Sequence, residues 1–481
     1  MSAAKTEGEL KPDPRQVRAA RRLWFKERVY ESRALQKLYA ALADARARAS
    51  LRRGRPYEAA DTLMRAWRHL GSEGLGARRV ERVGALVREC CYDGEGRLLP
   101  ASENRLRLDF VRAEKARELR RLYGSFPEEH RVRLRFPRPD PDPERQGDLA
   151  VLKSYDASTG ERGVLMVMYG EAVLAMAAVY DLGALASRYQ IVLEPSSWGY
   201  QEAKLFTYLG SDLDVLVQSP RRADFEFVES LKTNLVPTRV GAGEWVDPST
   251  FRPRAPGAEA EYDVVMVAAW DPLKRHEVFF RAASKIKRGR GRALKFALIG
   301  YPMGWGRTQV ESLLARHGLE GDCRIYERVP HGEVARVVAD SKVSLLLSRQ
   351  EGANRGIYEG MFCGTPVIVY RQQCGVNLDH VNARTGLLAE DEELAGAITH
   401  VLERPEEFDP REWALEHVGY ANATRTVNAA LRDMAARRGL PWTRDIVAKK
   451  NAPNLRYAEP GIYKKFDAEY ESLREFLLPP D

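Results

Sequence analysis

The chain has 481 residues, of which 44% are hydrophobic and 30% charged, a composition typical of a soluble globular protein with about two to four domains. No stretch reaches about 18 uninterrupted apolar residues, and Arg and Lys interrupt the first apolar cluster, so we expect a cytoplasmic protein without a transmembrane helix or signal peptide. The five cysteines lack metal-ligand spacing and indicate reduced thiols and no zinc site.

The net charge of +8 is concentrated in the first part of the chain. Residues 1–150 carry 34 Lys and Arg against 23 Asp and Glu, a balance of +11, whereas the rest carries 42 against 45, a balance of −3. This distribution favours an acidic partner for residues 1–135, which can be anionic lipid at the inner face of the membrane, an anionic glycan or nucleic acid. A solvated, arginine-rich helical surface explains the same charge without a partner, and no specific nucleic-acid binding is expected.

Residues 1–135 are expected to form a basic helical accessory domain without a catalytic constellation. Apolar spacing predicts helices at 14–50, 56–70, 77–91 and 104–123. In the first of them, Leu35, Leu38 and Leu42 follow helical spacing and are expected to form the apolar face.

A proline-rich linker at 136–150 separates this region from a first doubly wound α/β domain at 151–254. Short apolar runs predict its strands at 163–169, 189–193, 214–217 and 235–237. The loops after these strands should face an acceptor, and their candidate residues are Tyr169, Gly170, Glu171, Glu194 and Trp198. Glu171 can equally be a helix-start acid, and Trp198 a buried anchor.

A second doubly wound domain is predicted at 255–440. Its strands are expected at 262–269, 296–299, 324–326, 343–347, 367–370 and 385–388. The tail at 441–481 ends in an amphipathic helix, within 460–481, that we expect to pack on the first α/β domain.

The second domain contains the stretch around which the chain is organised, SRQEGANRGIYEGMFCGTPVIVY, which runs from Ser348 to Tyr370. Its pattern predicts a loop at the carboxyl end of a parallel strand, then a short helix, where such sheets bind ligands. Backbone amides near the helix start favour a phosphate, and the carboxylates of Glu351 and Glu359 can accept hydrogen bonds from hydroxyls. Two solvated helix-start glutamates are the alternative.

The stretch resembles the Glu-x7-Glu signature of the retaining GT-B glycosyltransferases called family 4. The resemblance implies a GT-B fold of two Rossmann-like domains facing a cleft, with Glu351 on the donor sugar and Glu359 on the nucleotide ribose. It covers the second half of the chain well and the first 140 residues not at all. The crossing between the halves, from Gly243 to Pro253, matches the family pattern in part.

The loop from Trp270 to His276 is similar to the diphosphate loop of this family. Lys274 matches the family lysine, but Ala269 stands where the family has arginine, so Arg275 or Arg355 is expected to supply the second cation. The resemblance implies that Glu351 and Lys274 are catalytic. It implies donor or nucleotide contacts by Glu359, Lys274, Arg275, Gly300, Arg328, Val329, Gly352, Ala353, Asn354, Arg355 and Gly356.

The sequence therefore predicts a metal-independent glycosyltransferase that uses a nucleotide sugar, in surface polysaccharide or glycoconjugate synthesis. Two features depart from the family: Ala269, and the lack of any histidine between Val151 and Arg254. They leave open an inactive GT-B scaffold subunit that acts through the basic helical domain. A nucleotide-sugar epimerase or hydrolase is a further alternative.

Overall fold

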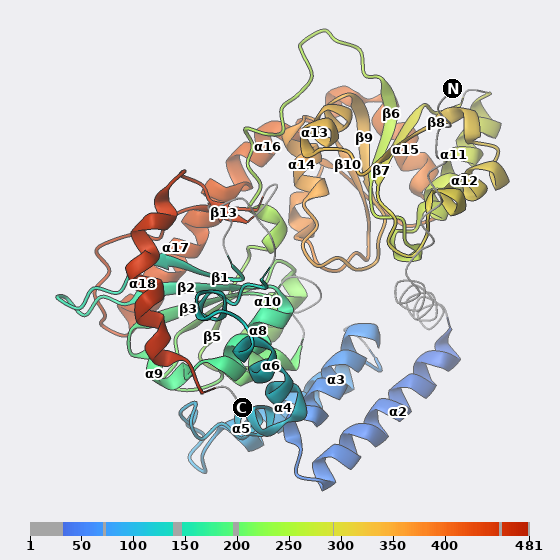
Figure 1. Cartoon of the computed structure of the whole chain (residues 1–481). Coiled ribbons are helices and arrows are strands. Elements are labelled where there is room, and N and C mark those ends of the chain that lie inside the picture. Colours follow the sequence, from blue (N-terminus) through green and yellow to red (C-terminus); the bar gives the residue numbers. More distant parts are fainter. Residues whose placement is uncertain are drawn as a thin grey trace, which may run out of the picture.

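Two β-sheets with parallel strands, each covered by helices, make up most of the protein, and a helical region precedes them (Figure 1). The computed structural model describes residues 32–70, 74–137, 147–195, 202–291, 293–451 and 455–479. This architecture confirms the predicted α/β fold, with two doubly wound, Rossmann-like domains and an N-terminal all-α region. Most of the predicted linker, 138–146, lies outside the described residues.

The helical region contains α2 (Arg33–Arg52), α3 (Pro56–Leu70), α4 (Ala77–Cys91), α5 (Arg105–Arg112), α6 (Glu114–Gly124) and α7 (Glu128–Val132). Two predictions were wrong here. The expected helix at 104–123 is two helices, because Ala113 adopts an extended conformation between them. The buried face of α2 is made by alanines, whereas Leu38 and Leu42 are 57% and 60% exposed, so small side chains set the close approach of α2 to α3.

The helical region shares one hydrophobic core with the first sheet. Trp67 of α3 packs on Phe227, with ring centroids 4.6 Å apart. Asn104 caps α5 and donates through Nδ2 to the carbonyls of Phe206 and Leu209, at 2.8 and 2.9 Å. These contacts fix the position of the helices against the first α/β domain, which composition alone does not show.

The first sheet has the order β1-β2-β3-β4-β5, with β1 antiparallel to β2 and the other neighbours parallel. Its strand β1 begins within the predicted linker, because its apolar side chains are buried against the C-terminal segment. The strands are β1 (Leu149–Lys153), β2 (Gly163–Met168), β3 (Tyr189–Glu194), β4 (Val215–Gln218) and β5 (Leu235–Thr238). Its helices are α8 (Gly170–Val179), α9 (Leu182–Ala186) and α10 (Arg222–Ser230).

The second sheet is entirely parallel and has the order β11-β10-β9-β6-β7-β8. Its strands are β6 (Tyr262–Val267), β7 (Phe296–Gly300), β8 (Cys323–Glu327), β9 (Ser341–Leu346), β10 (Val367–Tyr370) and β11 (Gly386–Ala389). Its helices are α11 (His276–Arg290), α12 (Arg307–Arg316), α13 (His331–Ala339), α14 (Gly356–Phe362) and α15 (Leu394–Glu403). Separate apolar clusters fill its two faces.

After the second sheet the chain returns to the first domain (Figure 1). A break at Gly419 separates α16 (Pro410–His417) from α17 (Tyr420–Arg437), and α17 packs in the core of the first domain. The strands β12 (Lys449–Lys450) and β13 (Arg456–Tyr457) and the helix α18 (Asp467–Ser472) follow. Tyr470 of α18 contacts β1, where its hydroxyl accepts from the Val151 amide at 3.2 Å.

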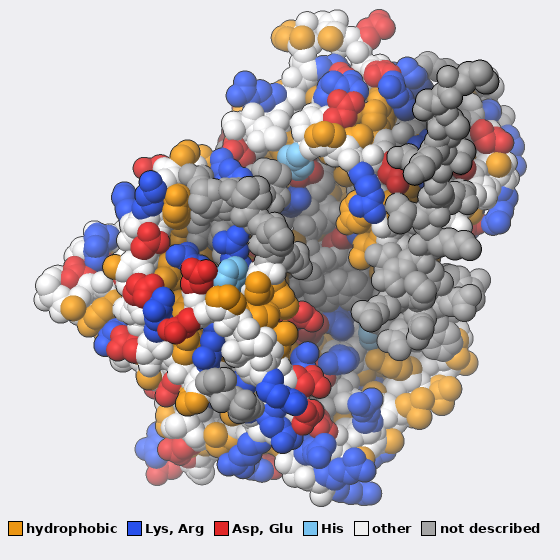
Figure 2. Space-filling view, in the orientation of Figure 1, with side chains coloured by type: hydrophobic (Ala, Val, Ile, Leu, Met, Phe, Trp, Pro, Cys, Tyr) orange, Lys and Arg blue, Asp and Glu red, His pale blue; other side chains and the backbone are white. Residues whose placement is uncertain are grey.

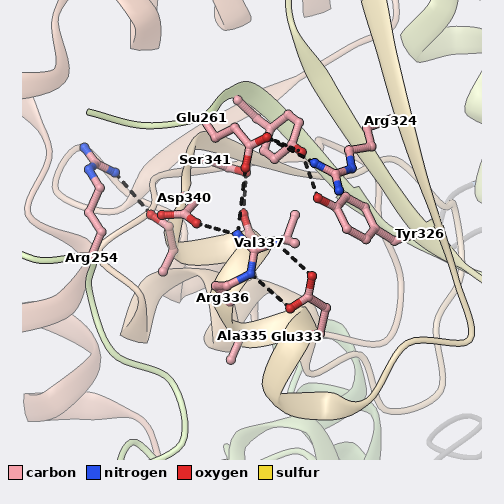
Figure 3. A network of polar contacts seen from close by, with 12 residues as sticks. Arg254, Glu261, Arg324, Tyr326, Glu333, Ala335, Arg336, Val337, Asp340 and Ser341 are labelled. Carbon is pink, nitrogen blue, oxygen red and sulfur yellow. Dashed lines mark hydrogen bonds and ion pairs between the residues drawn. The ribbon is translucent and has the colours of Figure 1, made fainter. Parts of the chain in front are cut away.

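A polar network lies at the amino ends of the strands of the second sheet, opposite their carboxyl ends (Figure 3). Arg324 donates to Glu261 at 3.4 Å, and Arg336 donates to Asp340 at 2.9 Å. Arg254, at the end of the crossing between the domains, donates to a backbone carbonyl of the same network. Helices long and apolar enough to cross a membrane are absent from the described part of the chain.

Candidate active site

A pocket of the second domain opens at the carboxyl ends of its strands, where the strand order reverses. The strand β6 pairs with β7, the next strand in the chain, on one side and with β9 on the other. Open α/β sheets bind ligands in the crevice at such a switch point. Here a pocket of about 640 Å³ is lined by the loops after β6 and β9, which carry Lys274 and Glu351.

Lys274 and Glu351 meet across this switch point. The Nζ atom of Lys274 lies 2.6 Å from Oε1 of Glu351, and the hydroxyl of Ser348 donates to the same oxygen. The Glu351 amide donates to the Cys374 carbonyl at 2.8 Å, which fixes the loop after β9. Lys274 and Glu351 are 77 residues apart in sequence, and the fold brings the ammonium group of one and the carboxylate of the other together in the pocket.

Glu359 lies in the first turn of α14, where the backbone turns its side chain into the protein. The residue is 5% exposed, and burial raises the pKa of its carboxyl even though Arg355 opposes the shift. Its Oε1 atom has no hydrogen-bond partner among the described residues. The Nε atom of Arg355 lies 3.8 Å from this oxygen, and Nε2 of the His331 ring lies 3.9 Å from it. A buried acceptor without a donor in the protein suits a hydroxyl donor on a ligand.

The structure places Arg275 outside the pocket, contrary to its predicted contact with the donor. Its guanidinium donates to the Leu347 carbonyl at 3.0 Å, pairs with Asp391, and lies over the Tyr370 ring at 4.5 Å. Arg275 is 8% exposed and has a left-handed backbone with φ of 60°. This conformation turns the side chain toward the neighbouring loops, so adjacency to Lys274 in sequence does not bring it to the same ligand.

The other predicted donor residues line the pocket around Lys274 and Glu351. They are Gly300, Arg328, Val329, Gly352, Ala353, Asn354, Arg355, Gly356 and Glu359. Ala269 also lines it, so the pocket wall is apolar where the family has arginine. Among the described residues, the lysine and arginines that line the pocket are therefore Lys274, Arg328 and Arg355. His331 also lines it.

Five further polar or large side chains line the pocket that the sequence did not single out: Asp271, Tyr301, Met303, His331 and Gln350. Asp271 is 3% exposed and accepts from the Leu273 amide at 2.8 Å, which caps the short helix that ends at Lys274. Burial lowers the pKa of His331, which therefore stays neutral beside Glu359. The sequence could have indicated Asp271 and Tyr301 as pocket residues, because both follow predicted parallel strands, whose carboxyl ends bind ligands.

The predicted acceptor residues that the structure describes lie at the carboxyl ends of β2 and β3. Tyr169 is 40% exposed with φ of 70°, and its amide donates to the Glu194 carbonyl at 3.0 Å. Gly170 and Glu171 begin α8, and Glu171 is exposed. Trp198 lies outside the described residues.

Glu194 does not face open solvent, contrary to its predicted place as an acceptor contact. It is 1% exposed, and its Oε2 atom lies 2.8 Å from Nζ of Lys449, which is also 1% exposed. Lys449 in turn lies over the Trp245 ring at 4.3 Å. A buried carboxylate requires such a partner, and the C-terminal strand supplies it.

A second cavity, of about 470 Å³, lies in the helical region between the turn from α2 to α3 and the start of α6. Its arginines are Arg53, Arg55, Arg105, Arg112 and Arg117. Three acids share the lining, and two of them pair with arginines of the same cavity. Lys and Arg side chains also gather over this part of the surface (Figure 2).

Residues 249–412, which are 164 of the 481 residues, match the family model described as "Glycosyl transferases group 1". No curated protein sequence matches the chain. The matched segment contains Lys274, Glu351 and Glu359, so this part of the second domain is similar to a glycosyl transferase domain.

Similar solved structures include sucrose-phosphate synthase from Thermosynechococcus elongatus, with 17% identity over 57% of this chain and 74% of that chain, at a TM-score of 0.43. HepE of Anabaena, in complex with UDP-glucose, has 15% identity over 56% of this chain and 78% of that chain, at 0.43. The lipopolysaccharide outer core galactosyltransferase WaaB has 14% identity over 56% and 75%, at 0.43.

Proposed function

We propose that the protein is a GT-B glycosyltransferase of family 4 type, which moves a sugar from a nucleoside-diphosphate sugar to an acceptor with retention of configuration. Surface polysaccharide or glycoconjugate synthesis is the proposed setting. The observation that carries the proposal is the buried Oε1 atom of Glu359, which has no hydrogen-bond partner among the described residues and lies in the same pocket as the Lys274–Glu351 pair. All three residues lie in the segment that matches the family model.

Each group has a distinct task in this proposal. Glu359 accepts a hydrogen bond from a ribose hydroxyl, and the amides of the loop from Gly352 to Gly356 bind phosphate oxygens. Lys274 binds the diphosphate, which competes with Glu351 for the ammonium group. The freed Glu351 carboxylate then faces the sugar, where it stabilises the positive charge that develops at the anomeric carbon as the bond to the diphosphate breaks.

The proposed reaction is independent of metal ions, because protein cations neutralise the charge that develops on the leaving diphosphate. Lys274 supplies the first of these cations. Arg328 and Arg355 line the same pocket and are the two candidates for the second. If this proposal is right, sugar transfer persists in the presence of EDTA.

A thermal-shift screen against UDP, GDP, TDP and ADP tests the proposed donor site, with the wild type and Glu359→Ala side by side. The Anabaena protein named above was solved with UDP-glucose, so UDP comes first. A ligand at 100 times its dissociation constant adds about 2.7 kcal/mol to the free energy of unfolding. For one domain of this size the melting temperature then rises by roughly 5–10 °C. A rise with one nucleotide that is lost in Glu359→Ala supports the site; no rise with any nucleotide contradicts it.

Two alternatives give different results. An inactive scaffold subunit is favoured by Ala269 and by the lack of a histidine in residues 151–254; it would transfer no sugar to any acceptor. An epimerase or hydrolase would convert the nucleotide sugar, or release free sugar, at full rate without an acceptor. Product analysis with and without acceptor separates both from the proposed transferase.

We further propose that residues 1–135 contact an acidic partner, with anionic lipid at the inner face of the membrane as the first choice. The charge balance of the first 150 residues and the arginine-lined cavity of the helical region support this proposal. The shared core with the first sheet would then hold the active site close to that surface.

A further inference from the structure

The donor pocket needs a second cation, and the loop after β6 does not supply one. A nucleoside diphosphate brings at least two negative charges to the pocket, and charge-assisted hydrogen bonds are the usual way to hold them. Lys274 is already paired with Glu351 at 2.6 Å, and Ala269 is apolar. Arg275 is bound to Asp391, away from the pocket.

Arg355 lies at the place where such a cation could act. It immediately precedes α14 and lines the pocket, with Nε 3.8 Å from the unpartnered oxygen of Glu359. Its Nη1 atom donates to the backbone carbonyl of Asn451 in the C-terminal segment. One bond of this kind leaves the other guanidinium N–H groups for a ligand, because arginine has five donors in a rigid fork.

Asn451 is itself fixed by the first domain and by the crossing between the domains. Its amide donates to the Trp245 carbonyl at 2.9 Å, and its Nδ2 atom donates to the Ala242 carbonyl at 2.7 Å. Its Oδ1 atom accepts from Lys449 at 3.0 Å, and Lys449 is the buried partner of Glu194. The carbonyl that binds Arg355 is therefore anchored by several contacts.

Arg328, the other candidate, has no such support. Its side chain is exposed, and its backbone is left-handed, with φ of 51°. Within the described part of the chain, Arg328 is held through its amide, which donates to the Gly300 carbonyl at 2.9 Å. An exposed side chain of this length loses more conformational entropy on binding than one that is already held.

We propose that Arg355 binds the diphosphate of the donor as the second cation, and that Asn451 is the positioning residue that holds it there. This inference rests on the proposed function. Asn451, which directly follows β12, thereby becomes part of the donor site, and the C-terminal segment links the first domain to the nucleotide. Glu194 then serves to anchor this strand through Lys449 instead of contacting an acceptor.

The test compares a nucleoside diphosphate with its own nucleoside by calorimetry, using UDP and uridine, GDP and guanosine, TDP and thymidine, and ADP and adenosine. In Arg355→Met we expect binding of the diphosphate to weaken roughly tenfold or more, with little change for the nucleoside. Arg355→Lys, which keeps the charge, should recover part of the loss. Arg316→Met, at an exposed position of α12 outside the pocket, is the matched control and should leave diphosphate binding unchanged, and Arg328→Met should weaken that binding less than Arg355→Met does.

Asn451→Ala tests the positioning role, because it removes the side-chain anchors and leaves the backbone carbonyl. We expect the same selective loss for the diphosphate, smaller than in Arg355→Met, at an unchanged nucleoside affinity. A merely structural role of Asn451 would weaken both ligands together. The inference is overturned if Arg355→Met binds the diphosphate as the wild type does, or if Arg328→Met shows the loss instead. If the wild type binds none of the four diphosphates, the proposed function itself fails.

Discussion

Replacing Glu359 by glutamine should have opposite effects on stability and on ligand binding. The carboxylate is 5% exposed, its Oε1 atom has no hydrogen-bond partner among the described residues, and Nε of Arg355 lies 3.8 Å from that oxygen. Burial of a charge without hydrogen bonds is costly in the ligand-free protein. Glutamine has nearly the same shape and no charge, so it removes this cost and also weakens the acceptor for a ribose hydroxyl.

The magnitudes follow from the same contacts. An unsatisfied buried polar group costs about 1–3 kcal/mol, so we expect Glu359→Gln to raise the melting temperature of the ligand-free protein by several degrees. A hydrogen bond to a charged group contributes about 1.5–3 kcal/mol, so nucleotide binding should weaken roughly 10- to 150-fold.

The stability difference should depend on pH. Burial raises the pKa of Glu359 above the ordinary value of 4.5, so the folded protein holds its proton more tightly than the unfolded chain does. The free energy of unfolding of the wild type therefore falls as pH rises from about 4.5 through the raised pKa. The difference between Glu359→Gln and the wild type should be largest at neutral pH and vanish below about pH 4.5.

Thermal denaturation between pH 4 and pH 8, together with calorimetric titration of the nucleotide found in the screen, measures both effects. Glu320→Gln, at an exposed position of the same domain, is the matched control and should change neither quantity. The reasoning is refuted if Glu359→Gln is less stable than the wild type at neutral pH, or if it binds the nucleotide equally well.

Three further changes test other parts of the structure. In Gly375→Ala, the new Cβ would lie 1.9 Å from the Glu351 carbonyl oxygen, at a residue with φ of 114°, so the variant should lose nucleotide binding. The control Gly289→Ala, whose new Cβ lies in open space on α11, should bind the nucleotide normally. Calorimetric titration compares the two variants. Lys449→Met leaves the Glu194 carboxylate buried without its partner, so the free energy of unfolding in urea should fall by about 3–5 kcal/mol. The double change Glu194→Gln with Lys449→Met should restore most of that stability. A double variant as unstable as the single one contradicts the buried pair. Vesicles rich in anionic lipid should retain the wild type at low salt. The double change Arg53→Ser with Arg112→Ser, in the cavity, should reduce retention more than Arg46→Ser with Arg48→Ser, outside it. Equal losses would mean that retention depends on net charge and not on the cavity.

The sequence by itself determined the alternation of strands and helices and the loops that end at the ligand-binding edge of the second sheet. Short apolar runs bounded by glycine and proline identify buried parallel strands, because such strands are covered on both faces. The spacing between Glu351 and Glu359 placed one in a loop and the other in the following helix, as the structure has them. These features depend on local burial, which periodicity reports directly.

Only the tertiary structure decided which charged groups meet. Lys274 and Glu351 are 77 residues apart, and Glu194 and Lys449 are 255 residues apart, so no local pattern pairs them. Arg275 and Arg355 look equally suited as cations in sequence, but a left-handed backbone turns the first toward Asp391. The backbone carbonyl of Asn451, in the C-terminal segment, holds the second at the pocket. The packing of distant loops and strands sets these partners, because a side chain's charge does not specify which of many opposite charges the fold will bring beside it.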